Sequence, residues 1–211
     1  MKSHQWTKIL WLATLFFIAA CGESTQTNQR SVSDSAAEAP DTENAPEGFE
    51  DDNPDAISTS FSLNGHDIKP LNLFWQPHRQ HNFTSATVVG HRSAFHAGYR
   101  FIRTEGCVLK HRRHGTRPLR LYWQPHRQDN FSSGTGVGDD TARHAHYYGV
   151  RKQGYIFTNR VAGTVPLYLF WNPYRQDNFS TATRVGIDSA VRSGYYFVRV
   201  QGYIFPPGRC R

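Results

Sequence analysis

The sequence predicts a mostly β domain of three equivalent units, closed about a pseudo-threefold axis, with one short helix in each unit. The first observation is a repeat without insertions or deletions: W-Q-P-H-R-Q-H-N-F recurs as W-Q-P-H-R-Q-D-N-F and W-N-P-Y-R-Q-D-N-F, starting at positions 75, 123 and 171. A fixed period indicates one supersecondary unit used three times, and one such unit cannot bury its apolar face alone. The second observation is an alternation of apolar and polar residues at the start of each copy. We expect a β-trefoil-like arrangement, with a three-bladed propeller as the alternative.

Each unit is expected to contribute four short strands. The first follows from the alternation of Leu71, Leu73 and Trp75, which places all three side chains on one face and makes the tryptophan of each unit a core residue. Pro77 ends this strand, because proline removes a donor from the ladder. The other strands are expected near Phe83, at residues 99–102 and at residues 106–109, with equivalents in the later units.

A short helix is expected between the second and third strands of each unit. Asp140 and Asp188 are candidate N-caps, because a carboxylate can accept from the free N–H groups at a helix start. Gly98 and Gly194 suit the position just after the helix, where a left-handed conformation is common.

The chain is expected to have three parts. Residues 1–21 have the form of a signal peptide, with a basic start and an apolar run at 9–20 that is too short to span a bilayer. Residues 22–58 are rich in small, polar and acidic side chains, which predicts a disordered acidic tether. Residues 59–211 hold the repeat domain, with units at about 66–113, 114–161 and 162–209.

The end of the apolar run, Ile18-Ala19-Ala20-Cys21-Gly22, resembles the bacterial lipobox, in which the cysteine becomes the lipidated first residue of the mature protein. The resemblance implies that Cys21 carries acyl chains such as palmitate, which anchor a protein stably when several act together. Gly22, in place of Asp, implies a lipoprotein of the outer membrane that faces the periplasm or the cell surface. The alternative is an ordinary signal peptide with a fortuitous cysteine.

Charge is divided unevenly along the chain. Ten of the 17 acidic residues lie in the tether, whereas 21 of the 24 Lys and Arg residues and only seven acids follow residue 60, which gives the repeat domain about +14. Such asymmetry indicates an anionic partner for the domain. Peptidoglycan, lipopolysaccharide or another anionic glycan suits an envelope protein, and nucleic acid is not expected there. The alternative is that the acidic tether only solvates the chain and screens the domain.

Two cysteines remain besides Cys21. Cys107 and Cys210 form an even pair in an exported chain, where disulfides persist. If the units close into a ring, the end of unit three lies beside unit one, and a bond between these cysteines would latch the closure.

The pattern P-L-x-L-F/Y-W-x-P…N-F…G-Y…G-Y-I-F covers residues 66–206 and resembles a bacterial repeat family of unknown function. The units of that family occur in threes on exported and cell-wall-associated proteins, often beside hydrolase domains. Its H-F-Y-T reads Asn82-Phe83-Thr84-Ser85 here, and its E-G survives only as Glu105-Gly106. The resemblance implies an exported accessory module and supplies no catalytic residues.

The polar turn after the first strand is the candidate ligand site. A guanidinium grips carboxylate or phosphate, or stacks on a sugar, while Gln and Asn add neutral donors and acceptors. Three such turns on one symmetric body would bind a repeating ligand with avidity. The alternative is that these side chains only hydrogen-bond the backbone of their own turn. The candidates are Arg79, Gln80, Asn82, Arg127, Gln128, Asn130, Arg175, Gln176 and Asn178.

No catalytic motif is visible, and no metal or cofactor is expected. His78 and His81 have a spacing that suits a shared metal, but unit three has Tyr174 in place of His78, and no cysteine or carboxylate cluster completes a site. Asp129 and Asp177 stand where unit one has His81, and nothing marks the facing carboxyl pair of a glycosidase. We therefore expect a monomeric, non-catalytic module that is anchored in the envelope and binds an anionic or glycan polymer. The alternatives are a protein-partner or structural accessory module and a cell-wall hydrolase.

Overall fold

The computed structural model describes residues 67–210. The expected signal peptide, the expected lipidation of Cys21 and the expected acidic tether lie outside the described residues. Within residues 67–210, no helix has both the length and the apolar character needed to cross a bilayer.

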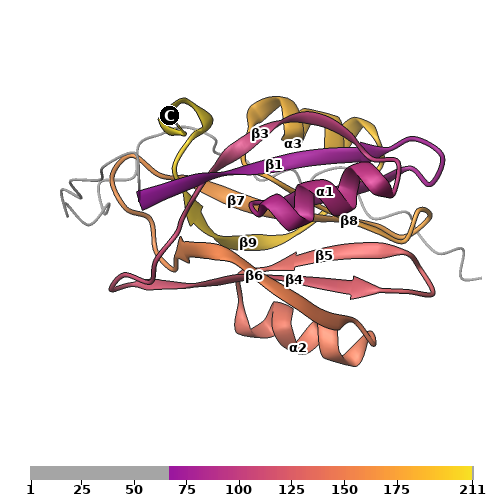
Figure 1. The fold of residues 1–211 in the computed structure, drawn as a ribbon, viewed down its shortest axis with the longest axis horizontal. Coiled ribbons are helices and arrows are strands. Elements are labelled where there is room, and N and C mark those ends of the chain that lie inside the picture. The colour runs from indigo at the N-terminus through magenta and orange to yellow at the C-terminus, as the bar shows by residue number, and fades with distance from the viewer. Residues whose placement is uncertain (1–66, 211) are drawn as a thin grey trace, which may run out of the picture. The chain divides into compact units, whose positions relative to one another are not determined.

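Each unit contributes two strands, a helix and a third strand, in that order (Figure 1). This confirms a mostly β domain with one short helix per repeat. Unit one holds β1 (Ile68–Gln76), β2 (His81–Ser85), α1 (Val88–His96) and β3 (Arg100–Leu109). Unit two holds β4 (Thr116–Gln124), β5 (Asp129–Ser133), α2 (Gly136–His144) and β6 (Tyr148–Phe157). Unit three holds β7 (Val165–Asn172), β8 (Asp177–Thr181), α3 (Arg184–Arg192) and β9 (Tyr196–Ile204), followed by the 3-10 turn η2 (Pro207–Arg209).

The strands form one antiparallel sheet in which every unit repeats the same local order, β2-β1-β3, β5-β4-β6 and β8-β7-β9. The units join through their last strands, so an open path runs β2-β1-β3-β6-β9-β7-β8, and β4 and β5 attach to β6. The joints between units are short: Leu109 pairs with Tyr155, and Phe157 pairs with Tyr203. An isolated bridge between Cys107 and Phe205 also brings the end of unit three beside unit one.

The prediction of four strands per unit is wrong, because the expected third and fourth strands form one continuous strand. In β3, the pairing with β1 skips Ile102 and Glu105, so each of these residues lies in a β-bulge. A bulge absorbs one extra residue without ending the ladder, and it re-aims side chains. The equivalent bulges of β6 and β9 hold Val150, Gln153, Val198 and Gln201.

The predicted N-caps are also wrong. Asp140 and Asp188 lie inside α2 and α3. The capping side chains are those of Thr135 and Thr183, the residues that directly precede the two helices. In α1, the Oγ1 of Thr87 accepts a hydrogen bond from the backbone N–H of Gly90 at 3.1 Å, and α2 and α3 repeat this contact. A Cβ on Gly90 would collide with the Oγ of Ser85, so the third helical residue must be glycine. At the other end, the expected glycines after the helix, Gly98 and Gly194, have φ of +77° and +72°, as predicted.

The core begins with equivalent leucines of the three units. Leu71, Leu119 and Leu167 are fully buried in a central cluster to which β3, β6 and β9 add one aliphatic residue each. The prediction that Trp75 and its equivalents are core residues is wrong, because their side chains are only half-buried. The neighbouring Phe74 is buried instead, since Ala94 of α1 covers the face of β1 that alternation alone would leave in solvent.

The predicted disulfide between Cys107 and Cys210 is confirmed, with the two Cα atoms 5.6 Å apart. Cys107 is fully buried in β3, and Cys210 follows η2. The bond therefore ties the end of unit three to unit one, beside the bridge that Cys107 forms with Phe205.

Candidate functional sites at the borders between units

Three equivalent cavities lie at the borders between units, and we call them the inter-unit cavities. The 3–1 cavity has a volume of about 300 Å³ and is lined by Arg175 and Tyr195 of unit three and by Trp75 and Asn82 of unit one. The other two cavities have volumes of about 260 Å³ each and the same composition. The 1–2 cavity has Arg79, Tyr99, Trp123 and Asn130, and the 2–3 cavity has Arg127, Tyr147, Trp171 and Asn178.

The second wall of each cavity depends on the β-bulges. In the 3–1 cavity this wall is formed by Ile102, which lies in a bulge of β3, and by its neighbour Arg103. The equivalent residues line the other cavities: Val150 and Arg151, and Val198 and Arg199. Each cavity therefore presents two arginines, a tryptophan, a tyrosine and an asparagine above an apolar floor.

The arginines of the 3–1 cavity are arranged differently from each other. The guanidinium of Arg175 lies 5.8 Å from the ring centroid of Trp75 and 5.7 Å from that of Tyr195, a cation–π arrangement. Arg103 is held by an ion pair in which its Nε lies 2.8 Å from Glu105.

Among the described residues, the Nη2 of Arg103 and the Nη1 of Arg199 are buried guanidinium nitrogens without a hydrogen-bond partner. Burial lowers the pKa of Arg199. These nitrogens leave donor capacity on the walls of two cavities.

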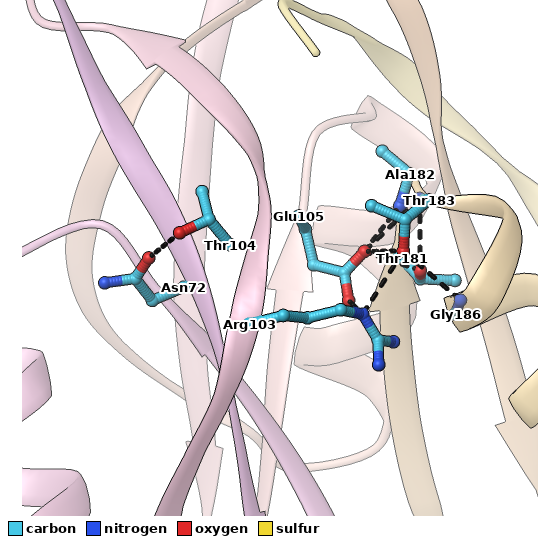
Figure 2. Close-up of polar contacts among 8 residues, drawn as sticks. All are labelled: Asn72, Arg103, Thr104, Glu105, Thr181, Ala182, Thr183 and Gly186. Atoms are coloured by element: carbon cyan, nitrogen blue, oxygen red, sulfur yellow. Dashed lines mark hydrogen bonds and ion pairs between the residues drawn. The ribbon is translucent and has the colours of Figure 1, made fainter. Parts of the chain in front are cut away.

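Figure 2 shows how Glu105 fastens unit one to unit three next to the 3–1 cavity. Its Oε2 accepts hydrogen bonds from the hydroxyls of Thr181 at 2.7 Å and Thr183 at 2.9 Å, and from the backbone N–H of Ala182 at 3.1 Å. Arg103 also donates to the Thr183 hydroxyl, at 3.2 Å. Because Thr183 is the N-cap of α3, one buried carboxylate fixes a helix start, a cavity arginine and a border between units.

The other two borders use a glutamine at the same bulge position. The side-chain oxygen of Gln153 accepts from the backbone N–H of Ala86 at 3.0 Å, and its nitrogen donates to the carbonyl of Thr84 at 3.1 Å. Gln201 makes the equivalent contacts with Ser132 and Gly134 of unit two. Each unit is thus clamped to its neighbour by one buried side chain.

A polar network connects the inter-unit cavities to the place where β2, β5 and β8 meet. In the 3–1 cavity, the hydroxyl of Tyr195 donates to Asp177 at 2.6 Å, and the side-chain nitrogen of Asn82 donates to the same carboxylate at 2.9 Å. In the 2–3 cavity, Tyr147 and Asn178 make the same bonds to Asp129, at 2.5 and 2.7 Å. The tyrosine and asparagine of these cavities are therefore fixed by a buried carboxylate.

Unit one differs from the other two units in this network, because it has a histidine where they have an aspartate. His81 occupies the position of Asp129 and Asp177, and its two ring nitrogens each lie 3.1 Å from a backbone carbonyl oxygen, one of Gln128 and one of Arg175. A carbonyl only accepts, so both ring nitrogens are satisfied only when both carry a proton. The histidine therefore leaves two carboxyls, rather than three, in the buried cluster.

The pKa values of the two buried carboxyls are raised, because burial disfavours their charged forms. Burial raises the pKa of Asp177 to about 7, against the hydrogen bonds from Tyr195 and Asn82, which lower it. Burial, and next the charge of Asp177, raises the pKa of Asp129 well above its usual range. Among residues 67–210, His81, Asp129 and Asp177 are close enough to share a metal, with ligand atoms within 4.8 Å. The same ring nitrogens and carboxylates have carbonyl, tyrosine and asparagine partners within the domain.

The sequence candidates fall into two groups in the structure. Arg79, Arg127 and Arg175 line the cavities, and so do Asn82, Asn130 and Asn178, but the arginine and asparagine of one turn lie in different cavities. The glutamines of the same turns line none of the three cavities. Gln80, Gln128 and Gln176 are exposed at φ of 57°, 54° and 51°, the left-handed conformation of a turn.

Sequence reasoning missed the cavity tyrosines and the second arginine of each site. Tyr99, Tyr147 and Tyr195 recur with the same period as the tryptophans, as do Arg103, Arg151 and Arg199. That recurrence was a usable signal, but the strand that carries these residues lies far from the turn in the sequence. Comparisons of the chain with protein-family models, curated protein sequences and solved structures find no match.

Proposed function

We propose that this protein is a non-catalytic module that binds an acidic glycan of the bacterial cell envelope through its three inter-unit cavities. The observation that carries the proposal is the threefold recurrence of arginine, tryptophan, tyrosine and asparagine around a cavity of about 260–300 Å³. Packing alone would not require two cations in each cavity, because burying or crowding charged groups is unfavourable unless they are paired.

The composition of the cavities matches one sugar residue with a carboxylate. A guanidinium binds a carboxylate with two parallel hydrogen bonds, and an indole or phenol ring stacks on the apolar face of a sugar. The unpartnered nitrogens of Arg103 and Arg199 supply donors on two cavity walls. The cavity volumes of about 260–300 Å³ lie at or just below the smallest ligand pockets, whose range is about 300–1,000 Å³, which favours a single ring over a larger molecule.

Three equal sites favour a polymer over a free sugar. Once one sugar residue binds, the next site meets its ligand at a high effective concentration, so weak single sites give tight overall binding. The expected lipid on Cys21 and the charge of about +14 on the repeat domain support an anionic envelope polymer such as peptidoglycan or lipopolysaccharide. On this proposal the acidic residues 22–58 act as a tether to the outer membrane.

We also infer that the three units close into a ring, and that the closure is propeller-like rather than trefoil-like. The bridge between Cys107 and Phe205, the disulfide of Cys107 with Cys210 and the equivalence of the three cavities support this arrangement. In each unit the strands are neighbours in one antiparallel sheet, as in the blade of a propeller, although a propeller blade usually has four strands and each unit here has three. A crystal structure of the repeat domain tests the inference.

The function is tested by co-sedimentation of the full chain, carrying Cys21→Ser to remove the lipid, with purified peptidoglycan and with lipopolysaccharide. The test variant combines Arg79→Ala, Arg127→Ala and Arg175→Ala, and we expect it to lose binding by far more than threefold, whereas each single change has a modest effect. The control variant combines Gln80→Asn, Gln128→Asn and Gln176→Asn. These residues do not line the cavities, and Asn tolerates the left-handed backbone conformation that they adopt. Equal binding by the test variant and the wild type contradicts the proposal, as does the absence of binding to either polymer at low salt.

A further inference from the structure

A further cleft lies mostly on unit two and is completed by Arg112 of unit one, and its lining differs from that of the three inter-unit cavities. It has a volume of about 680 Å³, and we call it the basic cleft after its four cations, Arg112, Arg120, Arg151 and Lys152. Arg151 also lines the 1–2 cavity, so the cleft and that cavity share a wall. The cleft therefore adjoins one of the three inter-unit cavities.

Two of these cations form a cross-strand pair of like charge. Arg120 of β4 lies directly opposite Lys152 of β6 in the ladder. Like charges placed directly opposite each other on neighbouring strands destabilise a sheet. Unit two therefore carries an arrangement that the stability of the fold does not explain.

The same position in unit one shows what a stabilising pair looks like. There, Asn72 lies opposite Thr104, and the threonine hydroxyl donates to the asparagine oxygen at 2.9 Å (Figure 2). Unit three has the uncharged pair Tyr168 and Val200. The fold thus accepts neutral pairs at this position twice, and a local departure of this kind is expected at a functional site.

The positive charge of the cleft is only partly offset. Arg120 pairs with Asp139 at 2.9 Å, and none of the residues that line the cleft is acidic. Lys152 donates to the hydroxyl of Tyr155 at 2.7 Å and lies 4.6 Å from the centroid of its ring. Both contacts hold the cations in place, and neither the hydroxyl nor the ring neutralises the ammonium.

Further cations surround the cleft. Burial, and then the nearby charges of Lys110 and Lys152, lowers the pKa of Lys69. Lys110 opens the segment K-H-R-R-H at residues 110–114, which joins units one and two and also supplies Arg112. The corresponding segment between units two and three is T-N-R-V-A, with a single cation. The positive potential is therefore concentrated at this one border.

We propose that the basic cleft binds a glycan that carries two or more phosphate or sulfate groups. Tetrahedral oxyanions match the guanidinium fork of Arg112 and Arg120, and Lys152 serves as a point charge for the same groups. The volume of the cleft exceeds twice that of an inter-unit cavity, which suits more than one sugar residue. This site is separate from the carboxylate-binding role of the cavities and does not depend on it.

The test variant combines Arg120→Asn with Lys152→Thr, which installs the neutral pair of unit one. The control variant combines Arg92→Gln with Arg192→Gln, which removes the same charge from exposed positions of α1 and α3. Both are made in the full chain with Cys21→Ser. Calorimetric titrations use three probes: a heparin tetrasaccharide for sulfate, a 1,4′-bisphosphorylated glucosamine disaccharide for phosphate, and a hyaluronan tetrasaccharide for carboxylate alone.

We expect the test variant to bind the sulfated probe, the bisphosphorylated probe or both at least tenfold more weakly than the wild type. We expect the control variant to change by twofold or less, and the preference between the two probes identifies the source of the oxyanion. The melting temperature of the test variant should equal or exceed that of the wild type, because a like-charge pair is removed. Lys152→Thr alone, which keeps the pair of Arg120 with Asp139, provides a second variant should the double change fail to fold.

Two results would overturn the proposal. One is an equal loss of affinity in the test and control variants, which would show a general effect of net charge. The other is no binding of either oxyanion probe by the wild type at low salt. The cavity variant with three Arg→Ala changes separates the two functions, because it should lose hyaluronan binding and keep the oxyanion probes.

Discussion

Asp129 and Asp177 come from equivalent positions of units two and three, yet their carboxyls lie in one buried cluster with His81, the equivalent residue of unit one. A strict threefold repeat would place three like carboxyls together. The histidine replaces one of them with a side chain that cannot carry a negative charge and whose two ring nitrogens each lie 3.1 Å from a backbone carbonyl oxygen. The departure from symmetry at His81 therefore makes the centre electrostatically tolerable.

We predict that the domain is less stable at pH 8 than at pH 5. The folded-state pKa of Asp177, about 7, lies above its ordinary value of 3.8, so the folded state binds more protons between these values. Stability from this group is complete below the ordinary value and is lost as the pH rises through about 7. Thermal denaturation should show a melting temperature several degrees lower at pH 8, and Asp177→Asn should flatten this dependence. Asp188→Asn, at a carboxyl outside the buried cluster, should leave the slope unchanged; a wild-type stability that rises from pH 5 to pH 8 contradicts the prediction.

The half-buried tryptophans and the buried phenylalanine beside them should respond differently to truncation. Phe74→Ala removes a fully buried ring and should lower the free energy of unfolding by about 3–5 kcal/mol. Trp75→Ala should lower it by only about 1–2 kcal/mol, because part of the indole already contacts solvent. The change should weaken glycan binding at the 3–1 cavity, since the indole stacks with Arg175 there. Urea denaturation measures both values, and equal losses in the two variants would show that the tryptophan is a core residue after all.

Removal of the disulfide should destabilise the domain without changing its fold. Cys107 and Cys210 are 103 residues apart, and closing a loop of that length is worth up to about 4–5 kcal/mol in the chain-entropy account. Protein with Ser at both positions should therefore unfold at a lower urea concentration, and reduction of the wild type should have the same effect. Peptide mapping without reductant checks that the bond forms. Two free thiols in protein isolated from the periplasm would exclude the bond.

Glu105→Gln tests the clamp between units one and three. The carboxylate oxygen accepts from two hydroxyls and from backbone N–H groups, so an amide nitrogen at that position would face donors. We expect a loss of about 1–3 kcal/mol in the free energy of unfolding, the range for leaving buried groups unpaired. Thr104→Ser, in the same strand, keeps its hydroxyl and serves as the control. A variant as stable as the wild type would mean that glutamine serves at all three borders equally well.

Much of the local structure could be predicted from the sequence, because it depends on neighbours in the chain. Alternation located the first strand of each unit, and Gly98 marked the end of α1. The merger of two expected strands into β3 could not be read in this way, because the bulges at Ile102 and Glu105 exist only through pairing with β1. Local patterns contain no information on which strand will be the partner.

Prediction of the candidate site from the sequence was limited for the same reason, because each inter-unit cavity is formed by residues of two units. The recurring turn predicted Arg175 and Asn82 as site residues, and both line the 3–1 cavity. They come from different units, because Arg175 belongs to unit three and Asn82 to unit one. One unit considered alone holds only half of each cavity. The tyrosine that completes the cavity, Tyr195, bonds Asp177 of its own unit, and Asn82 of unit one reaches both of them only once the two units pack together.

Lipidation of Cys21 is the remaining prediction, and on the proposed function it would determine where the domain acts. The apolar run at residues 9–20 ends directly before this cysteine, which is the arrangement that lipoprotein signals share. Cells grown with an alkyne fatty acid should yield labelled wild-type protein in the outer-membrane fraction. Cys21→Ser should abolish both the label and the membrane association, whereas Cys107→Ser should keep both, because that residue pairs with Cys210 instead. Persistent label and membrane association in Cys21→Ser would refute the lipid anchor, and the glycan-binding module would then need another means of attachment to the envelope.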